Sequence, residues 1–332
     1  MCALAIVKFI NHRNNDPKEQ LDHLLLFPES SVYEGKTMFS PSATLDSLYA
    51  LILQEAFGDD HLEDDPKTRS VLGAVTLATN PLSPSAIAAL LGFSIKSVFL
   101  RLSSVHSLLI LQEDTNHPVQ PFHKSFPDFI VDPTRCINQR FLISPPNHHS
   151  ELLIGCLELM NQRLEKNMCK LPDAISNDKV VDLQERIELY VDHTLQYACK
   201  SWHKHFVNLK RVPAHASKIT SVLQQFLEER FLFWLEVLSL LGIVRVAVDA
   251  LEVAAKCLEV CRAYMLKVFP EFTHTGSRHC QPLTSLRTAF TLSLDSLRSS
   301  ANLLHISITQ LSPCPPKHQL CGNYMNNIPI PC

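Results

Sequence analysis

Residues 83–92 read SPSAIAALLG, which is the pattern of one complete short helix. Ser83 suits the position before the first turn, because its side-chain oxygen can accept a hydrogen bond from a free backbone N–H. Pro84 suits the first helical position, where no N–H donor is needed. Apolar residues inside the segment give it a face to bury, and Gly92 ends it, as glycine ends many helices.

Two further helices and a hairpin are expected around this segment. A helix from Thr68 to Thr79 stops at Asn80-Pro81, and Ser94 opens a third helix that extends to about Val105. An apolar strand over 107–111 leads to a turn at 114–118, from which residues 119–122 can return as a second strand. Three helices followed by a hairpin are the arrangement of a winged-helix domain, which we expect over residues 66–135.

Long helices are expected in most of the remaining chain. Apolar periodicity predicts helices over 151–171, 180–202, 217–241 and 244–268, so residues 148–268 are expected to form a helical bundle. Residues 1–58 also read as helices, one of which opens near Ser40-Pro41 and ends near Gly58. The acidic run 59–66 is the expected boundary after them. Residues 271–332 have few charges and poor periodicity, so an irregular or disordered tail is expected. The expected fold class is mainly α.

Composition and charge bound the function. The chain has 332 residues, of which 46% are hydrophobic and 19% charged, as is typical of a globular protein. Thirty Lys and Arg against thirty-three Asp and Glu give a net charge of −3, which disfavours nucleic-acid binding. The third helix of the expected winged helix carries only Lys96 and Arg101 as basic residues. DNA binding through that helix is therefore an alternative, not the leading interpretation.

A nucleotide-binding loop is not apparent. Only eight residues are glycine, although such loops need glycine where the backbone approaches phosphate. Gly35-Lys36-Thr37 resembles the end of a phosphate loop, but Ser30 stands where the first glycine is required and no strand precedes it. Residues Ser30–Thr37 are more typical of a connector. An NTPase with an atypical cradle there stays an alternative.

The sequence indicates a cytoplasmic protein. It shows no targeting segment, and its most apolar stretch, 231–248, is interrupted by Glu236 and Arg245, so a buried core helix is expected there and no membrane interaction. The eleven cysteines form no CxxC pair, which favours reduced thiols in the cytosol.

No metal site is expected. Cys199 and His203 share a helix face but His205 does not, and a structural zinc site needs four well-placed ligands. The same interpretation applies to the other close groups, which are His148 with His149, and His274 with His279 and Cys280.

His123 is the main candidate functional residue. It lies in PFHKSFPDF, residues 121–129, just after the expected second strand and at the start of a short helix, in which three phenylalanines are expected to face the core. A histidine beside Lys124 at a helix start is well placed to donate a hydrogen bond to an anion. A purely structural histidine is the alternative interpretation.

Several longer motifs resemble fungal NACHT-domain proteins, which are signal-transducing NTPases of the same broad class as animal nucleotide-binding leucine-rich-repeat receptors. The resemblance covers roughly residues 1–265. It is carried by VLGAV at 71–75, NPLS at 80–83, PFHKSFPDF at 121–129, LQYACKSWHKH at 195–205 and FLE at 226–228.

The resemblance implies a role for His123. In such switches the winged-helix histidine contacts the diphosphate of bound ADP and holds the resting state, and His123 matches that motif. The family's phosphate loop and magnesium carboxylates have no counterpart here, and the tail past about Phe272 departs from the family. The resemblance therefore implies a non-catalytic fragment of a nucleotide-gated switch, with no cofactor of its own. ADP or ATP belongs to the complete architecture, and the expected partner is a full-length NACHT relative or another protein.

Overall fold

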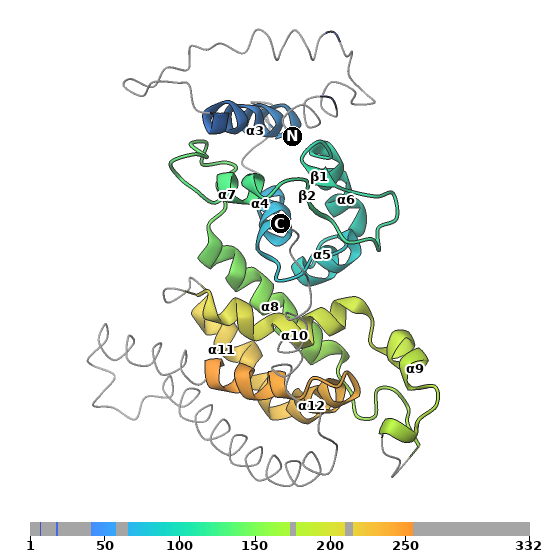
Figure 1. Cartoon of the computed structure of the whole chain (residues 1–332). Helices are drawn as coiled ribbons and strands as arrows, with labels where there is room; N and C mark the ends of the chain where they lie inside the picture. Colours follow the sequence, from blue (N-terminus) through green and yellow to red (C-terminus); the bar gives the residue numbers. More distant parts are fainter. Residues whose placement is uncertain are drawn as a thin grey trace, which may run out of the picture. The chain divides into compact units, whose positions relative to one another are not determined.

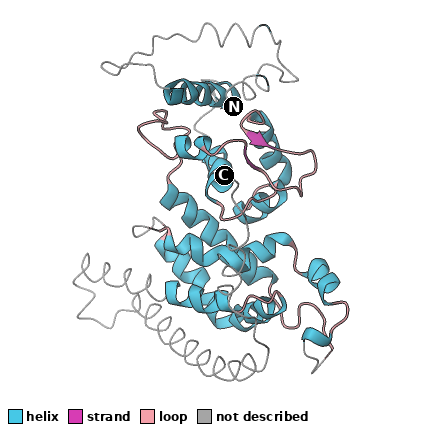
Figure 2. Cartoon of the chain, in the orientation of Figure 1, coloured by secondary structure: helices cyan, strands magenta, loops and turns pink. Residues whose placement is uncertain are grey.

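The computed structural model describes residues 7, 18, 41–57, 66–172, 177–209 and 215–254. Within these ranges the chain is mainly helical and holds one small antiparallel sheet, so the expected fold class is confirmed (Figures 1 and 2). The expectations for Ser30–Thr37, the acidic connector, residues 255–268 and the tail over 271–332 lie outside the described residues.

Three helices and a hairpin follow one another as expected over residues 66–135. They are α4 (Pro66–Leu77), α5 (Pro84–Leu91), α6 (Ile95–Ser104), β1 (Leu109–Ile110) and β2 (Gln120–Pro121). The two strands pair antiparallel, with Leu109 opposite Pro121. An isolated bridge between Leu82 and Val119 ties the segment before α5 to the hairpin. The hairpin is thus attached to the helices by backbone hydrogen bonds as well as by apolar packing.

Local chemistry fixes the ends of α5 and α6. The Ser83 side chain accepts from the backbone N–H of Ala86, and the Ser94 side chain accepts from that of Ser97. Gly92 has φ 68°, a left-handed conformation that glycine adopts without a steric cost. These contacts confirm the helix boundaries expected at Ser83, Gly92 and Ser94.

The bundle is built around α8 (Pro145–Arg163), which contacts α4, α5, α10 (His193–Val207) and α11 (Ala216–Gln225). The expected helix over 151–171 was wrong in its bounds, because two prolines start α8 at 145 and the chain leaves the helix at Leu164. The expected helix over 180–202 was also wrong, because it is divided. A short turn η1 (Asn177–Lys179) and α9 (Leu183–Tyr190) come first, and then Asp192 caps α10 by accepting from the N–H of Leu195.

The expected helix over 217–241 contains a π-helical turn. Helix α11 passes through η2 (Phe226–Arg230) into α12 (Phe231–Leu240). Phe226 and Trp234 are eight residues apart, so on a regular α-helix their side chains would point about 80° apart around the helix axis. A π-helical turn takes up one extra residue and reduces this angle to about 20°. Both rings consequently pack on Trp202, with centroids 5.6 and 5.9 Å away.

The apolar stretch that includes α12 is interrupted as the sequence indicates. Gly242 follows the helix with φ 68°, and the chain is helical again over 245–254. No helix in the described part of the chain combines the length and the apolar character that crossing a membrane requires.

Helix α8 lies very close to α5 at one point. A Cβ atom added to Gly155 would overlap with the backbone carbonyl of Leu90, the last but one residue of α5. Because a backbone carbonyl in a packed helix has little freedom to move, the absence of a side chain at position 155 is what permits this packing.

We therefore expect Gly155→Ala to lower the free energy of unfolding. Alanine in place of glycine inside a helix normally stabilises by up to about 1 kcal/mol, but overpacking against a backbone atom costs about 1–3 kcal/mol, so the net change should be a loss of up to about 2 kcal/mol. Urea unfolding followed by circular dichroism measures it. The exposed α8 variant Gln162→Ala is the control and should change stability by less than about 0.5 kcal/mol. A stabilised Gly155→Ala would contradict the close packing.

Candidate functional site

His123 lies between β2 and the short helix α7 (Ser125–Ile130), where the sequence indicated it. Its side chain is half-buried. Phe126 and Phe129 of α7 are buried as expected, each with 1% of its surface exposed, whereas Phe122 is only half-buried. The core-facing phenylalanines therefore hold α7 in place, and α7 in turn fixes the backbone next to His123.

The protonation of the His123 ring follows from its partners. Its Nδ1 atom is 3.2 Å from the backbone nitrogen of Ser125 and 2.6 Å from the Ser125 hydroxyl. A backbone N–H only donates, so Nδ1 is the acceptor and the neutral ring carries its proton on Nε2. Nε2 has no hydrogen-bond partner among the described residues. The ring thus presents a free N–H donor.

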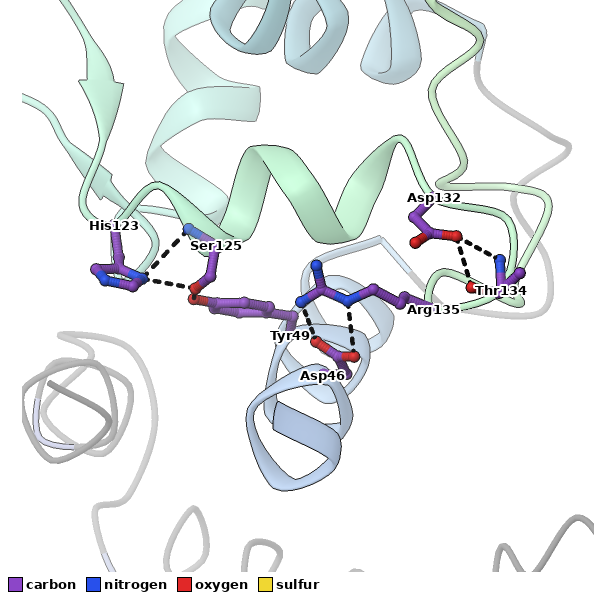
Figure 3. A network of polar contacts seen from close by, with 7 residues as sticks. All are labelled: Asp46, Tyr49, His123, Ser125, Asp132, Thr134 and Arg135. Carbon is purple, nitrogen blue, oxygen red and sulfur yellow. Dashed lines mark hydrogen bonds and ion pairs between the residues drawn. The ribbon is translucent and has the colours of Figure 1, made fainter. Parts of the chain in front are cut away.

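A tyrosine from a distant helix extends this contact. The Tyr49 hydroxyl on α3 (Pro41–Phe57) lies 2.7 Å from the Ser125 hydroxyl, 76 residues away in sequence. The Tyr49 ring is 3% exposed and packs on Phe126 and Phe129, with ring centroids 5.5 and 5.4 Å apart. Helix α3 is therefore connected to His123 through a single intervening side chain, as Figure 3 shows.

An ion pair holds α3 at a second point. Arg135, which follows α7, donates to both carboxylate oxygens of Asp46, from Nε at 3.0 Å and from Nη2 at 2.6 Å. These hydrogen bonds raise the pKa of the Arg135 guanidinium above its ordinary value. Asp46 and Tyr49 are three residues apart and so share one face of α3. Figure 3 shows both of them directed at the segment that carries Ser125 and Arg135.

The loop that presents Arg135 is itself ordered by Asp132. One Asp132 carboxylate oxygen accepts from the Thr134 N–H at 2.8 Å and from the Thr134 hydroxyl at 2.7 Å. These bonds lower the pKa of the Asp132 carboxyl, chiefly through the Thr134 hydroxyl. The loop and α7 together form one face against which α3 packs.

The geometry around His123 offers a hydrogen-bond donor, whereas the thiols in the described ranges are not activated. The four cysteines in the described ranges are buried, and burial raises the pKa of each thiol, that of Cys136 to about 11. Such thiols stay protonated near neutral pH and are poor nucleophiles. What His123 offers is a neutral, directed N–H donor, which a phosphate oxygen can accept.

The histidines considered as metal ligands lie inside the bundle. Cys199, His203 and His205 are all buried on α10, and His148 and His149 are buried on α8. No group of three potential ligands that could hold a metal ion occurs within the described ranges. His274, His279 and Cys280 lie outside them.

Two of these histidines join a buried hydrogen-bond network. The Nδ1 atoms of His149 and His205 are 2.9 Å apart, and His205 Nε2 is 2.8 Å from the Tyr197 hydroxyl. That hydroxyl accepts from the backbone N–H of Thr79, just after α4. The network thus connects the winged helix with α8 and α10 of the bundle.

A pocket of about 330 Å³ lies beside the loop that follows α8. It is lined on one side by Lys166, Asn167 and Leu171, and on the other by Glu236 and Ser239 of α12. It shares no residue with the contacts around His123, and a Glu236 carboxylate oxygen already accepts from the Asn167 N–H at 3.1 Å.

The buried histidines predict a stability that depends on pH. Burial lowers the pKa of His149 and His205, and that of His203 to about 4. Below the ordinary value of about 6.5 the unfolded chain binds protons that the folded chain does not, so the free energy of unfolding falls as the pH drops from about 6.5 to about 4. We expect a loss on the order of 1–2 kcal/mol per histidine between pH 7 and pH 5.

Urea unfolding at the two pH values measures this loss. His205→Gln should reduce the difference between them, whereas the exposed His117→Gln should leave it unchanged. Equal pH dependence in wild type and His205→Gln would show that the buried pair does not titrate in this way.

Comparison of the chain with protein-family models, with curated proteins and with solved structures found no match. The residues around His123, together with the motif in which it lies, are consequently the basis on which a function can be inferred.

Proposed function

We propose that this chain is the helical and winged-helix arm of a NACHT-type nucleotide-gated switch, and that His123 contacts the diphosphate of ADP held by a nucleotide core on a partner protein of that family. The observation that carries the proposal is the free Nε2–H donor of His123, in a motif that resembles the winged-helix histidine of such switches.

The chemistry of this contact suits a switch. A neutral imidazole N–H donates to a phosphate oxygen without a permanent charge, and the exposed Lys124 next to it adds a positive charge at the same edge. A single hydrogen bond of this type is worth about 1 kcal/mol. That is enough to bias an equilibrium between two arrangements but too little to lock it, so loss of the phosphate contact can release the arm.

The packing supports transmission from His123 to the bundle. Helix α3 is attached to α7 on one side of the winged helix, through Tyr49 and Asp46. Helix α8 is packed against α4 and α5 of the same domain, through the close approach at Gly155. A displacement of the winged helix would therefore have to move or break one of these two attachments, which is how a local contact becomes a larger rearrangement.

The surface of α6 offers little to DNA. Leu100 on that helix is 65% exposed, and Arg101 donates to the backbone carbonyl and hydroxyl of Ser97 within the helix. An exposed leucine has no partner in a groove lined by phosphates, which attract mainly Lys and Arg.

We accordingly expect no specific or general affinity for duplex DNA. Fluorescence anisotropy of a labelled 20-base-pair duplex should not rise with added protein at low salt. A saturable rise that weakens steadily with salt concentration would favour the winged helix as a nucleic-acid-binding module instead.

The contact with phosphate is tested by release of a fluorescent ADP analogue. A fungal NACHT nucleotide core loaded with mant-ADP is mixed with this chain, and release is followed by stopped-flow fluorescence. We expect the chain to slow release of mant-ADP. With His123→Ala, release should be about five- to tenfold faster than with the wild-type chain, which is the equivalent of one hydrogen bond.

His117→Ala is the matched control, because His117 is an exposed histidine of the same domain that pairs with Asp114. It should behave like wild type. The proposal would be contradicted if the wild-type chain left the rate of mant-ADP release unchanged. Equal slowing by the wild-type chain and by His123→Ala would contradict it too.

A further inference from the structure

We propose that Tyr49 is a positioning residue that holds His123 in its donor state through the Ser125 hydroxyl, so that the availability of Nε2–H depends on α3 remaining docked on α7. This inference rests on the proposed function, in which the Nε2–H donor binds a phosphate.

The Ser125 hydroxyl is the adjustable part of the contact. A serine hydroxyl rotates freely and can either donate to or accept from a neighbour. Here it lies 2.6 Å from Nδ1 of His123 and 2.7 Å from the Tyr49 hydroxyl. When Tyr49 donates to the oxygen of Ser125, the serine proton is directed to Nδ1, and adjacent hydrogen bonds aligned in this way strengthen one another.

Tyr49 is suited to set this direction because it is held firmly. Its ring is wedged on Phe126 and Phe129, both of which are 1% exposed. One turn away on the same face of α3, Asp46 is bound through both carboxylate oxygens by Arg135. The hydroxyl can therefore leave Ser125 only if α3 itself moves relative to α7.

Loss of the Tyr49 contact weakens the preference for one ring state. The backbone N–H of Ser125 would remain 3.2 Å from Nδ1 and would still donate to it. The shorter contact, with the Ser125 hydroxyl, would no longer have a fixed donor and acceptor. The ring gains freedom to rotate and to place its proton on Nδ1, and a ring protonated there has no N–H at Nε2 to offer a phosphate. Displacement of α3 would in this way reduce the donor without any change at His123.

The first measurement needs no nucleotide. Side-chain ¹⁵N NMR of the full chain distinguishes the two nitrogens of each histidine and reports which one carries the proton. We expect a single Nε2–H state for His123 in the wild type. In Tyr49→Phe, which keeps the ring packing and removes only the hydroxyl, the two ¹⁵N shifts of His123 should move toward each other as the second state becomes populated.

Ser125 variants separate the relay from simple packing. Ser125→Ala should reproduce the Tyr49→Phe spectrum, Ser125→Thr should restore the wild-type one because it keeps the hydroxyl, and the double variant should be no worse than Ser125→Ala alone. Additive effects in the double variant, or an unchanged His123 spectrum in Tyr49→Phe, would overturn the relay.

The second measurement joins the relay to the phosphate contact. In the mant-ADP release assay, release with Tyr49→Phe should be about two- to threefold faster than with the wild-type chain. This change is smaller than that expected for His123→Ala, which removes the donor completely. If the spectrum changes but no variant affects release, the relay stands and the phosphate contact is wrong. If His123→Ala affects release but Tyr49→Phe changes neither spectrum nor rate, the phosphate contact stands and the relay is wrong.

Discussion

The close approach of α8 to α5 at Gly155 is the constraint on which the described arrangement depends. A helix that carried any side chain at that point would be pushed away from the carbonyl of Leu90. The hydrogen bond from the Thr79 N–H to the Tyr197 hydroxyl crosses the same boundary, and the contacts of His205 with Tyr197 and His149 continue it inside the bundle. The winged helix is therefore joined to the bundle by packing first and by hydrogen bonds second.

On its other side the winged helix is joined to α3. Here different contacts provide the stability of the attachment and its orientation. Burial of a large aromatic side chain contributes roughly 1.5–3 kcal/mol, whereas one hydrogen bond contributes about 1 kcal/mol and a partly exposed ion pair about 1 kcal/mol or less. The Tyr49 ring therefore provides most of the attachment to α7. Its hydroxyl, together with the Asp46–Arg135 pair, determines the orientation in which that attachment is made.

The sequence predicted best the elements whose limits are set by neighbouring residues. Ser83, Gly92 and Ser94 mark helix ends by local hydrogen bonding and backbone conformation, and the structure confirms all three. It also confirms the hairpin, for which an apolar strand, a turn and a second short strand follow one another directly in the sequence. The break at Asp192 was missed although a local signal existed, since aspartate before a helical pattern is a common cap.

Features that depend on contacts between distant residues were not predicted. The π-helical turn at 226–230 has no local signature and is explained by two aromatic rings that pack on Trp202. Likewise His123 was identified from its motif, but the link from Ser125 to Tyr49 spans 76 residues. A tyrosine on an apolar helix face indicates a buried ring, and only the tertiary structure identifies the partner of its hydroxyl.

The most direct test of the account is the structure of this chain in complex with an ADP-loaded NACHT core. We expect Nε2 of His123 to lie about 3 Å from an oxygen of the ADP diphosphate, while Nδ1 keeps its contacts with Ser125. A complex in which the His123 ring faces away from the nucleotide would contradict it.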